Sequence, residues 1–183
     1  MKRIDMTNVK EAGGFERPEA GAYICKIVAV EDFPRSEYLK VTYDIAEGRF
    51  AGYYTKTRED HPEWTWAGAY SKSYKTSALS FFKRFCTAVS RSNGNFVFDG
   101  GAVNADERTL IGKRIGLLFQ EEEYYGNDGE KKTRLIVNRE FSVDKLASQK
   151  TPKPKLLPEE PQTGSIDGFM SIPEGMDEEM PFA

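Results

Sequence analysis

Residues 36–46 read SEYLKVTYDIA, and this stretch decides the expected fold. Apolar and polar side chains alternate strictly along it. The first set is Leu39, Val41, Tyr43 and Ile45, and the second is Tyr38, Lys40, Thr42 and Asp44. Successive side chains of a strand point to opposite faces, so a period of two predicts a β-strand with one buried and one wet face.

The segments around this strand extend it into a series. Residues 21–33 are rich in β-branched and aromatic residues and stop before Pro34, so a short link joins them to residues 36–46 as a predicted hairpin. Residues 49–58 (RFAGYYTKTR) are predicted as a third strand, with Gly52 at a bulge or bend. Residues 59–75 carry aromatic and basic side chains without a clean period, and we expect a long loop there.

The period changes after this loop. Apolar residues recur at steps of three and four: Leu79, Phe82, Phe85 or Cys86, and Val89. This spacing predicts one amphipathic helix with a Thr or Ser N-cap at 76–77 and a stop at Asn93-Gly94. A helical turn is expected near 106–110. Residues 113–124 and 131–143 are predicted as two further strands around the turn at 126–129 (GNDG).

The resulting order is β-β-β-α-β-β, which is the order of the OB-fold, a five-stranded barrel with one helix between strands 3 and 4. A small α+β sheet with one covering helix has the same order and stays open as an alternative. The expected organisation is a flexible leader at 1–19, an OB-fold nucleic-acid-binding domain at 20–147, a disordered Pro-rich linker at 148–175 and an acidic tip at 176–183. Residues 151–183 hold six of the nine prolines, and such a composition buries too little apolar area to offset its ordering entropy.

Charge is distributed unevenly along the 183 residues. Residues 159–183 hold seven acids and no Lys or Arg, so the first 158 residues carry all 26 basic residues, 22 of the 29 acids and a net charge of +4. A basic body with an acidic tail indicates a polyanionic ligand. No signal peptide and no apolar run near the roughly 20 residues of a membrane span is visible, so we expect a cytoplasmic protein that does not enter membranes.

No catalytic or metal-binding motif stands out, so we expect a protein that is not an enzyme and needs no cofactor or metal. Cys25 and Cys86 are far apart and are predicted to be small buried residues rather than a disulfide. His61 is interpreted as a solvated loop residue. The run Glu121-Glu122-Glu123 is interpreted as a charged strand end, because neighbours in a strand point to opposite faces and cannot all bind one ion.

Aromatic and basic side chains gather on the predicted wet strand faces and on the loops. A basic groove with aromatic stacking platforms holds single strands regardless of sequence, at about 1–3 kcal/mol per stacked base. The predicted nucleic-acid contacts are Tyr38, Lys40, Tyr54, Lys56, Arg58, Trp64, Trp66, Lys72, Tyr74, Lys75, Tyr125, Lys131 and Lys132. The same aromatics also fit a structural role, in which tyrosines favour strand faces and the two tryptophans cap a barrel end.

The last eight residues, 176–183, read MDEEMPFA. Three carboxylates before Met-Pro-Phe suit a partner with a basic rim and an apolar pocket. With the element order and the aromatic, basic body, this tip resembles the single-stranded-DNA-binding proteins of the bacterial or phage type, whose OB domain is followed by a linker and an acidic tip that ends in Pro-Phe.

The resemblance implies sequence-independent binding of single-stranded DNA, homo-oligomers, and recruitment of replication, recombination or repair proteins. The implied partner-binding residues are Asp177, Glu178, Glu179, Met180, Pro181 and Phe182. Three features depart from the family: Ala183 follows Phe182, the linker is short and carries Pro and Lys, and the aromatic loop before the helix is larger than expected. A phage-encoded version in the cytoplasm of a bacterial host fits them. The alternative function is an OB-like phage accessory or assembly module that binds protein rather than DNA.

Overall fold

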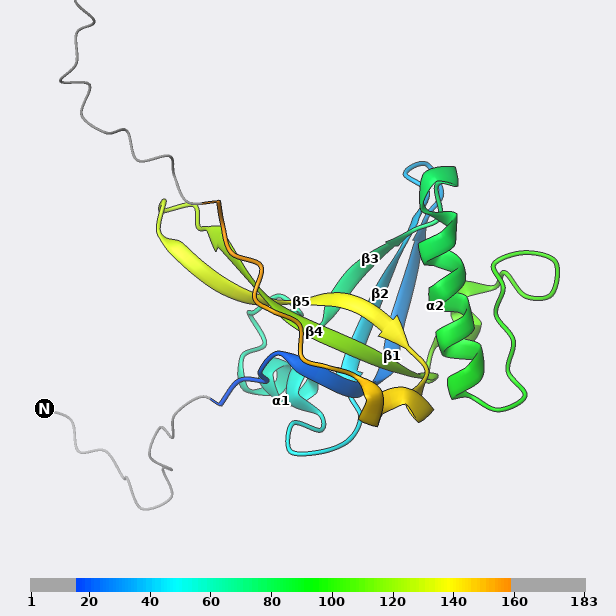
Figure 1. The fold of residues 1–183 in the computed structure, drawn as a ribbon, viewed down its shortest axis with the longest axis horizontal. Coiled ribbons are helices and arrows are strands. Elements are labelled where there is room, and N and C mark those ends of the chain that lie inside the picture. The colour runs from blue at the N-terminus through cyan, green and yellow to red at the C-terminus, as the bar shows by residue number, and fades with distance from the viewer. Residues whose placement is uncertain (1–15, 159–183) are drawn as a thin grey trace, which may run out of the picture.

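The computed structural model describes residues 16–158, and in this range five strands form one antiparallel sheet. They are β1 (Gly21–Phe33), β2 (Tyr38–Ile45), β3 (Ala69–Ser73), β4 (Arg114–Tyr125) and β5 (Lys131–Phe141), in the spatial order β3-β2-β1-β4-β5. The helix α2 (Leu79–Ser92) comes between β3 and β4 in the chain (Figure 1). The mainly β class and this helix confirm the coarse prediction, and the sheet is open.

The β1–β2 hairpin forms where alternation predicted it. Its strands pair in antiparallel register from Cys25 opposite Ile45 to Phe33 opposite Tyr38. All four apolar residues of β2 are buried, as predicted. Asp44 is the exception on the other face, because it is buried as well.

The third strand predicted at 49–58 is wrong, because α1 (Tyr53–Asp60) occupies that segment. The buried carboxylate of Asp44 accepts hydrogen bonds from the backbone N–H groups of Tyr54 and Thr55, both at 3.0 Å. A carboxylate that bonds the first amides of a helix stabilises its N-terminus. Gly52 is no bulge: it has φ 71° and turns the chain into the helix in the left-handed region that favours glycine.

The actual third strand, β3, lies inside the segment that was predicted to be a loop. It pairs with β2 from Thr42 opposite Ala69 to Tyr38 opposite Ser73. Tyr70 and Lys72 lie opposite Val41 and Leu39, on the apolar face of β2. The sequence hides this strand because a tyrosine and a lysine occupy its inward positions.

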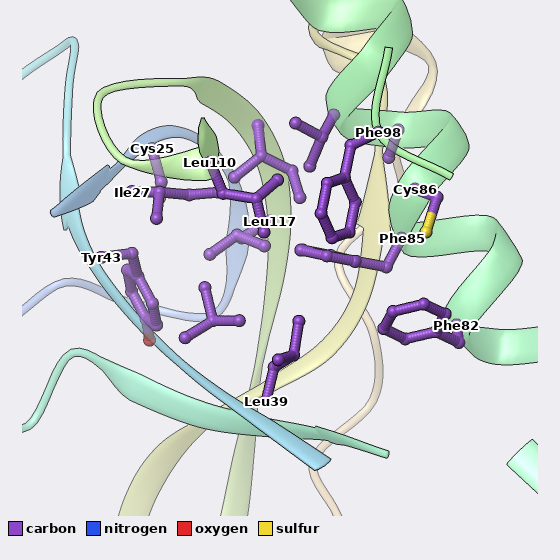
Figure 2. Packing of buried hydrophobic residues seen from close by; sticks show 14 of the residues in the cluster. Cys25, Ile27, Leu39, Tyr43, Phe82, Phe85, Cys86, Phe98, Leu110 and Leu117 are labelled. Atoms are coloured by element: carbon purple, nitrogen blue, oxygen red, sulfur yellow. The ribbon is translucent and has the colours of Figure 1, made fainter. Parts of the chain in front are cut away.

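The core lies between the sheet and α2. Helix residues Phe82, Phe85 and Cys86 pack toward Leu117 and neighbouring strand residues (Figure 2). Cys25 and Cys86 are free and buried, which confirms the prediction for both. Leu79 was predicted on the buried face but is 49% exposed at the first position of α2, directly after a 3₁₀ turn (Thr76–Ala78). Neither predicted capping side chain caps α2, whereas the stop at Asn93 is confirmed.

The two edge strands of the open sheet are joined by side chains. Lys72 of β3 donates to the carboxylate of Glu140 of β5 at 2.7 Å, and both side chains are buried. Arg84 of α2 lies 3.5 Å from the other oxygen of the same carboxylate. The hydroxyl of Tyr70 is nearby: burial and this carboxylate hold the pKa of Tyr70 well above its ordinary value.

The chain after β5 stays ordered beyond the boundary predicted at residue 147. A 3₁₀ helix (Val143–Ser148) follows, and residues 149–158 then run along β4 (Figure 1). Lys155 donates its backbone N–H to Glu121 at 2.8 Å and accepts from Glu123 at 2.9 Å. We call residues 153–157 the strap. The rest of the linker and all of the acidic tip lie outside the described residues.

Across residues 16–158, no helix offers an apolar stretch of the length that a bilayer crossing requires.

Candidate functional site

A cleft of about 530 Å³ opens between α1, the following loop and the β4–β5 hairpin. In Figure 1, α1 lies beside this hairpin, whereas α2 covers the opposite end of the sheet. Aromatic rings and guanidinium groups share the cleft wall. They are Tyr53, Trp64, Trp66, Tyr124, Arg17, Arg58 and Arg134.

The loop between α1 and β3 supplies two indoles. Trp64 is 47% exposed and stacks on His61, with ring centroids 4.0 Å apart and planes 9° apart. The guanidinium of Arg58 donates to the backbone oxygen of Trp64, which ties α1 to this loop. Trp64 is therefore a large, partly exposed ring held in a set orientation.

Trp66 is fixed more firmly. Its indole N–H donates to the carbonyl oxygens of Tyr43 at 3.1 Å and Gly68 at 3.2 Å. A Cβ on Gly68 would lie 2.5 Å from the Tyr43 oxygen and 2.9 Å from this indole nitrogen, so only glycine fits there. The half-buried ring of Trp66 is thus both part of the cleft wall and a structural support.

The hairpin supplies an aromatic ring with a cation stacked on it. The guanidinium carbon of Arg134 lies 4.9 Å from the ring centroid of Tyr124. The same guanidinium bonds the carboxylate of Glu122 at 2.7 Å. Hydrogen bonds from Lys155 and then from Arg134 lower the pKa of Glu122, so this carboxylate is charged at neutral pH.

The cleft carries a small excess of positive charge. Its three arginines face two acids, Glu19 and Glu121, among the lining residues. Planar rings next to guanidinium groups suit a ligand in which flat groups alternate with negative charges. A nucleic acid is such a ligand, because its flat bases alternate with phosphates. Within residues 16–158, no cluster of His, Cys, Asp and Glu side chains is arranged to hold a metal ion.

Four predicted contacts line this cleft: Arg58, Trp64, Trp66 and the buried Tyr54. Four others are exposed or half-buried elsewhere. Tyr38 stacks on Phe33 at 4.8 Å and Lys40 lies 3.8 Å from Glu31, both near the tip of the β1–β2 hairpin. Lys56 donates to the Ala51 oxygen at 3.1 Å, and Lys75 is exposed before α2.

Tyr54, Lys72 and Tyr74 are not the open contacts that were predicted. Tyr54 is buried edge-to-face against Tyr43 at 5.5 Å, and burial raises the pKa of its hydroxyl to about 12. Lys72 is buried in its ion pair with Glu140. Tyr74 donates to Asp32 at 2.8 Å and packs its edge against Phe82. Tyr54 was predicted on a wet strand face and Lys72 and Tyr74 in an open loop, whereas the fold buries Tyr54 and Lys72 and engages Tyr74.

The residues predicted as contacts around the turn between β4 and β5 do not line the cleft. Lys131 pairs with Glu123 at 2.8 Å, Lys132 pairs with Asp128, and Tyr125 is exposed but does not line the cleft. The cleft uses Tyr124 and Arg134 instead. Adjacent residues of a strand point to opposite faces, and no local pattern indicates which of the two tyrosines faces the cleft. Tyr53 and Arg17 were missed for lack of any periodic pattern.

No protein-family model matches the chain, and no curated protein matches its sequence.

Proposed function

We propose that this protein binds single-stranded DNA without sequence preference, and that the cleft beside α1 is its binding site. The observation that carries the proposal is the meeting of Trp64 and Tyr124, from segments far apart in the chain, with Arg58 and Arg134. Bases stack on the rings, and the guanidinium groups neutralise phosphates and stack as planes.

The sheet order supports the same proposal. An OB-fold has this strand order, this helix position, and binding loops between strands 1–2 and 4–5. The β4–β5 hairpin is one wall of the cleft. The buried Lys72–Glu140 pair joins the two strands that meet when such a sheet closes into a barrel. We therefore propose the OB barrel as the finer description of the fold.

If the cleft neutralises phosphates, the affinity for DNA must depend on the salt concentration. Each cation that replaces a condensed counterion lowers the logarithm of the association constant by about 0.7 per decade of salt for single strands. Affinity for a dT oligonucleotide should therefore fall steeply between low and physiological salt. A chain with a merely apolar protein-docking cleft would show little salt dependence with the same oligonucleotide.

The site is tested by truncating its rings. Trp64→Ala and Tyr124→Ala should each weaken binding of a fluorescent dT oligonucleotide by about 5- to 150-fold in anisotropy titrations, which corresponds to roughly 1–3 kcal/mol per stacked base. The matched control is Phe81→Ala, because Phe81 is an exposed aromatic on α2, outside the cleft. Equal losses in all three variants, or no loss in the cleft variants, would contradict the assignment.

The acidic tip completes the proposed function. Its carboxylates and Phe182 suit a replication or recombination protein with basic residues around an apolar pocket. Deleting residues 176–183 should abolish binding of such a protein and leave the DNA affinity of the cleft at physiological salt. A partner that binds the deleted chain equally well would contradict this role.

A further inference from the structure

A second hollow, here called the groove, borders the core, because the core residues Phe82, Cys86 and Phe98 are part of its lining. Its volume is about 520 Å³, and it runs between α2 and residues 97–99. The helix lines it with residues three and four apart, which form one continuous face. They are Leu79, Phe82, Lys83, Cys86, Thr87, Ser90 and Arg91.

The floor of the groove is apolar. Leu79 and Val97 are 49% and 47% exposed, and Phe82 and Phe98 lie beneath them. Burial raises the pKa of Cys86 to about 11, so its thiol is neutral at physiological pH. Large aliphatic side chains that are half exposed over buried rings form an apolar surface, and covering such a surface with a ligand is energetically favourable.

Two cations border this apolar floor. Lys83 and Arg91 stand about two helical turns apart, roughly 12 Å, and neither forms an ion pair with a carboxylate of residues 16–158. The one acid of the lining is Asp99. Its oxygens accept the backbone N–H groups of Gly101 at 3.1 Å and Asn104 at 2.9 Å, so it is engaged by its own loop.

We propose that this groove binds the chain's own acidic tip, with Phe182 on the apolar floor and the run Asp177-Glu178-Glu179 beside Lys83 and Arg91. The match is one of chemistry: adjacent carboxylates followed by Met-Pro-Phe meet separated cations that border an apolar floor. The groove shares no residue with the cleft, so this site lies beyond the proposed DNA-binding function.

The chain is long enough for this contact. Phe182 is 24 residues beyond the last described residue, which allows a reach of up to about 80 Å. A domain of this size has a radius of gyration of about 14 Å, so the tip reaches any face of it. The cleft is the poorer host, because Glu19 and Glu121 line it and its Arg134 already bonds Glu122.

The contact is tested by comparing amide spectra of the full-length ¹⁵N-labelled protein with those of Phe182→Ala. Lys83, Thr87, Arg91 and Val97 should shift, cleft amides should not, and the differences should persist on dilution. Shifts confined to the cleft, no shifts at all, or shifts that vanish on dilution because the tip comes from a second copy would each overturn the proposal.

A peptide of residues 176–183 provides the second arm. Titrated into the Phe182→Ala protein, it should bind saturably with a Kd below about 1 mM, since a tethered segment has an effective concentration in the millimolar range. Lys83→Glu with Arg91→Glu should weaken this binding at least tenfold, whereas Lys145→Glu, an exposed lysine elsewhere, should not. Equal binding by both variants would overturn the groove as the site.

Discussion

The cleft and the groove are nearly the same size, about 530 and 520 Å³, yet their walls are built differently. In the cleft, Arg58 is bonded to the backbone of Trp64, and Arg134 is stacked on Tyr124 and bonded to Glu122. In the groove, Lys83 and Arg91 stand beside exposed aliphatic side chains and form no ion pair with any carboxylate between residues 16 and 158.

This difference separates two kinds of anionic ligand. Fixed planar cations beside flat rings suit a ligand with flat bases and regularly spaced phosphates. Unpaired cations around an aliphatic floor suit a short acidic peptide with one large apolar side chain. The volume of a hollow therefore does not distinguish its ligand. Whether its charged side chains are already bonded to other groups is more informative.

The largest expected effect comes from the carboxylate of Glu140, which lies in neither hollow but pairs with side chains of β3 and α2. Glu140 lies on β5, the strand that carries Arg134, and contacts Arg84 of the groove helix. Glu140→Ala leaves Lys72 buried without its partner, which should lower the free energy of unfolding by about 3–5 kcal/mol in urea titrations. Lys72→Met with Glu140→Leu should restore most of it. A double variant as unstable as the single one would contradict the role of the ion pair.

Asp44→Ala should damage the cleft and spare the groove. It removes the acceptor for the first amides of α1, at a cost of roughly 2–3 kcal/mol for hydrogen bonds to a buried charged group. Binding of dT oligonucleotide should fall and binding of the tip peptide should not. The matched control is Glu31→Ala, which removes an exposed acid beside Lys40 and should change the free energy of unfolding by less than about 1 kcal/mol. Loss of both ligands would contradict the independence of the two regions.

Removing one cation from each region should separate their salt dependences. Arg134→Gln should reduce the slope of log affinity against log salt for a dT oligonucleotide by about 0.7, because one fewer counterion is released. Lys83→Gln should leave this slope unchanged. Parallel titrations at four or five salt concentrations measure both, and an equal change in the two variants would place DNA on the groove side as well.

The smallest effect concerns the strap, whose Lys155 bonds the carboxylate of Glu122. Lys155 and Arg134 lower the folded-state pKa of Glu122, so this carboxylate contributes stability above its unfolded pKa of about 4.3 and loses it as pH falls through the lower folded value. The difference in unfolding free energy between the wild type and Glu122→Gln should be below about 1 kcal/mol at pH 7 and should shrink as pH falls below about 4.3. A difference that grows on acidification would contradict the ion pairs.

Local patterns predicted most strands and the helix α2, because alternation and helical spacing depend only on residues that are close together in the sequence. Residues 21–33, 36–46 and 79–92 fold as their periods indicate. The third strand was misplaced because a distant carboxylate, Asp44, caps residues 53–60 as a helix. That contact joins residues that are ten or eleven positions apart in the chain, so a periodic pattern of neighbouring residues cannot reveal it.

The candidate site was predicted less completely, for the same reason. Trp64 and Trp66 could be singled out because two indoles close together in a polar loop are visible in the sequence, and both line the cleft. Tyr54 and Lys72 are buried rather than open, because burial depends on which elements cover a face. Tyr125 was predicted in place of Tyr124. Which of two adjacent strand residues faces the cleft depends on how the strand packs in the tertiary fold, and the local sequence does not show it.

The most direct test uses the fact that both tryptophans of the chain, Trp64 and Trp66, line the cleft. Intrinsic tryptophan emission therefore reports on the cleft and not on the groove. Titration with poly(dT) should quench this emission to saturation, salt should reverse the quenching, and the tip peptide should leave the emission unchanged. Unchanged emission at low salt, together with no mobility shift of the poly(dT), would contradict single-stranded DNA binding in the cleft.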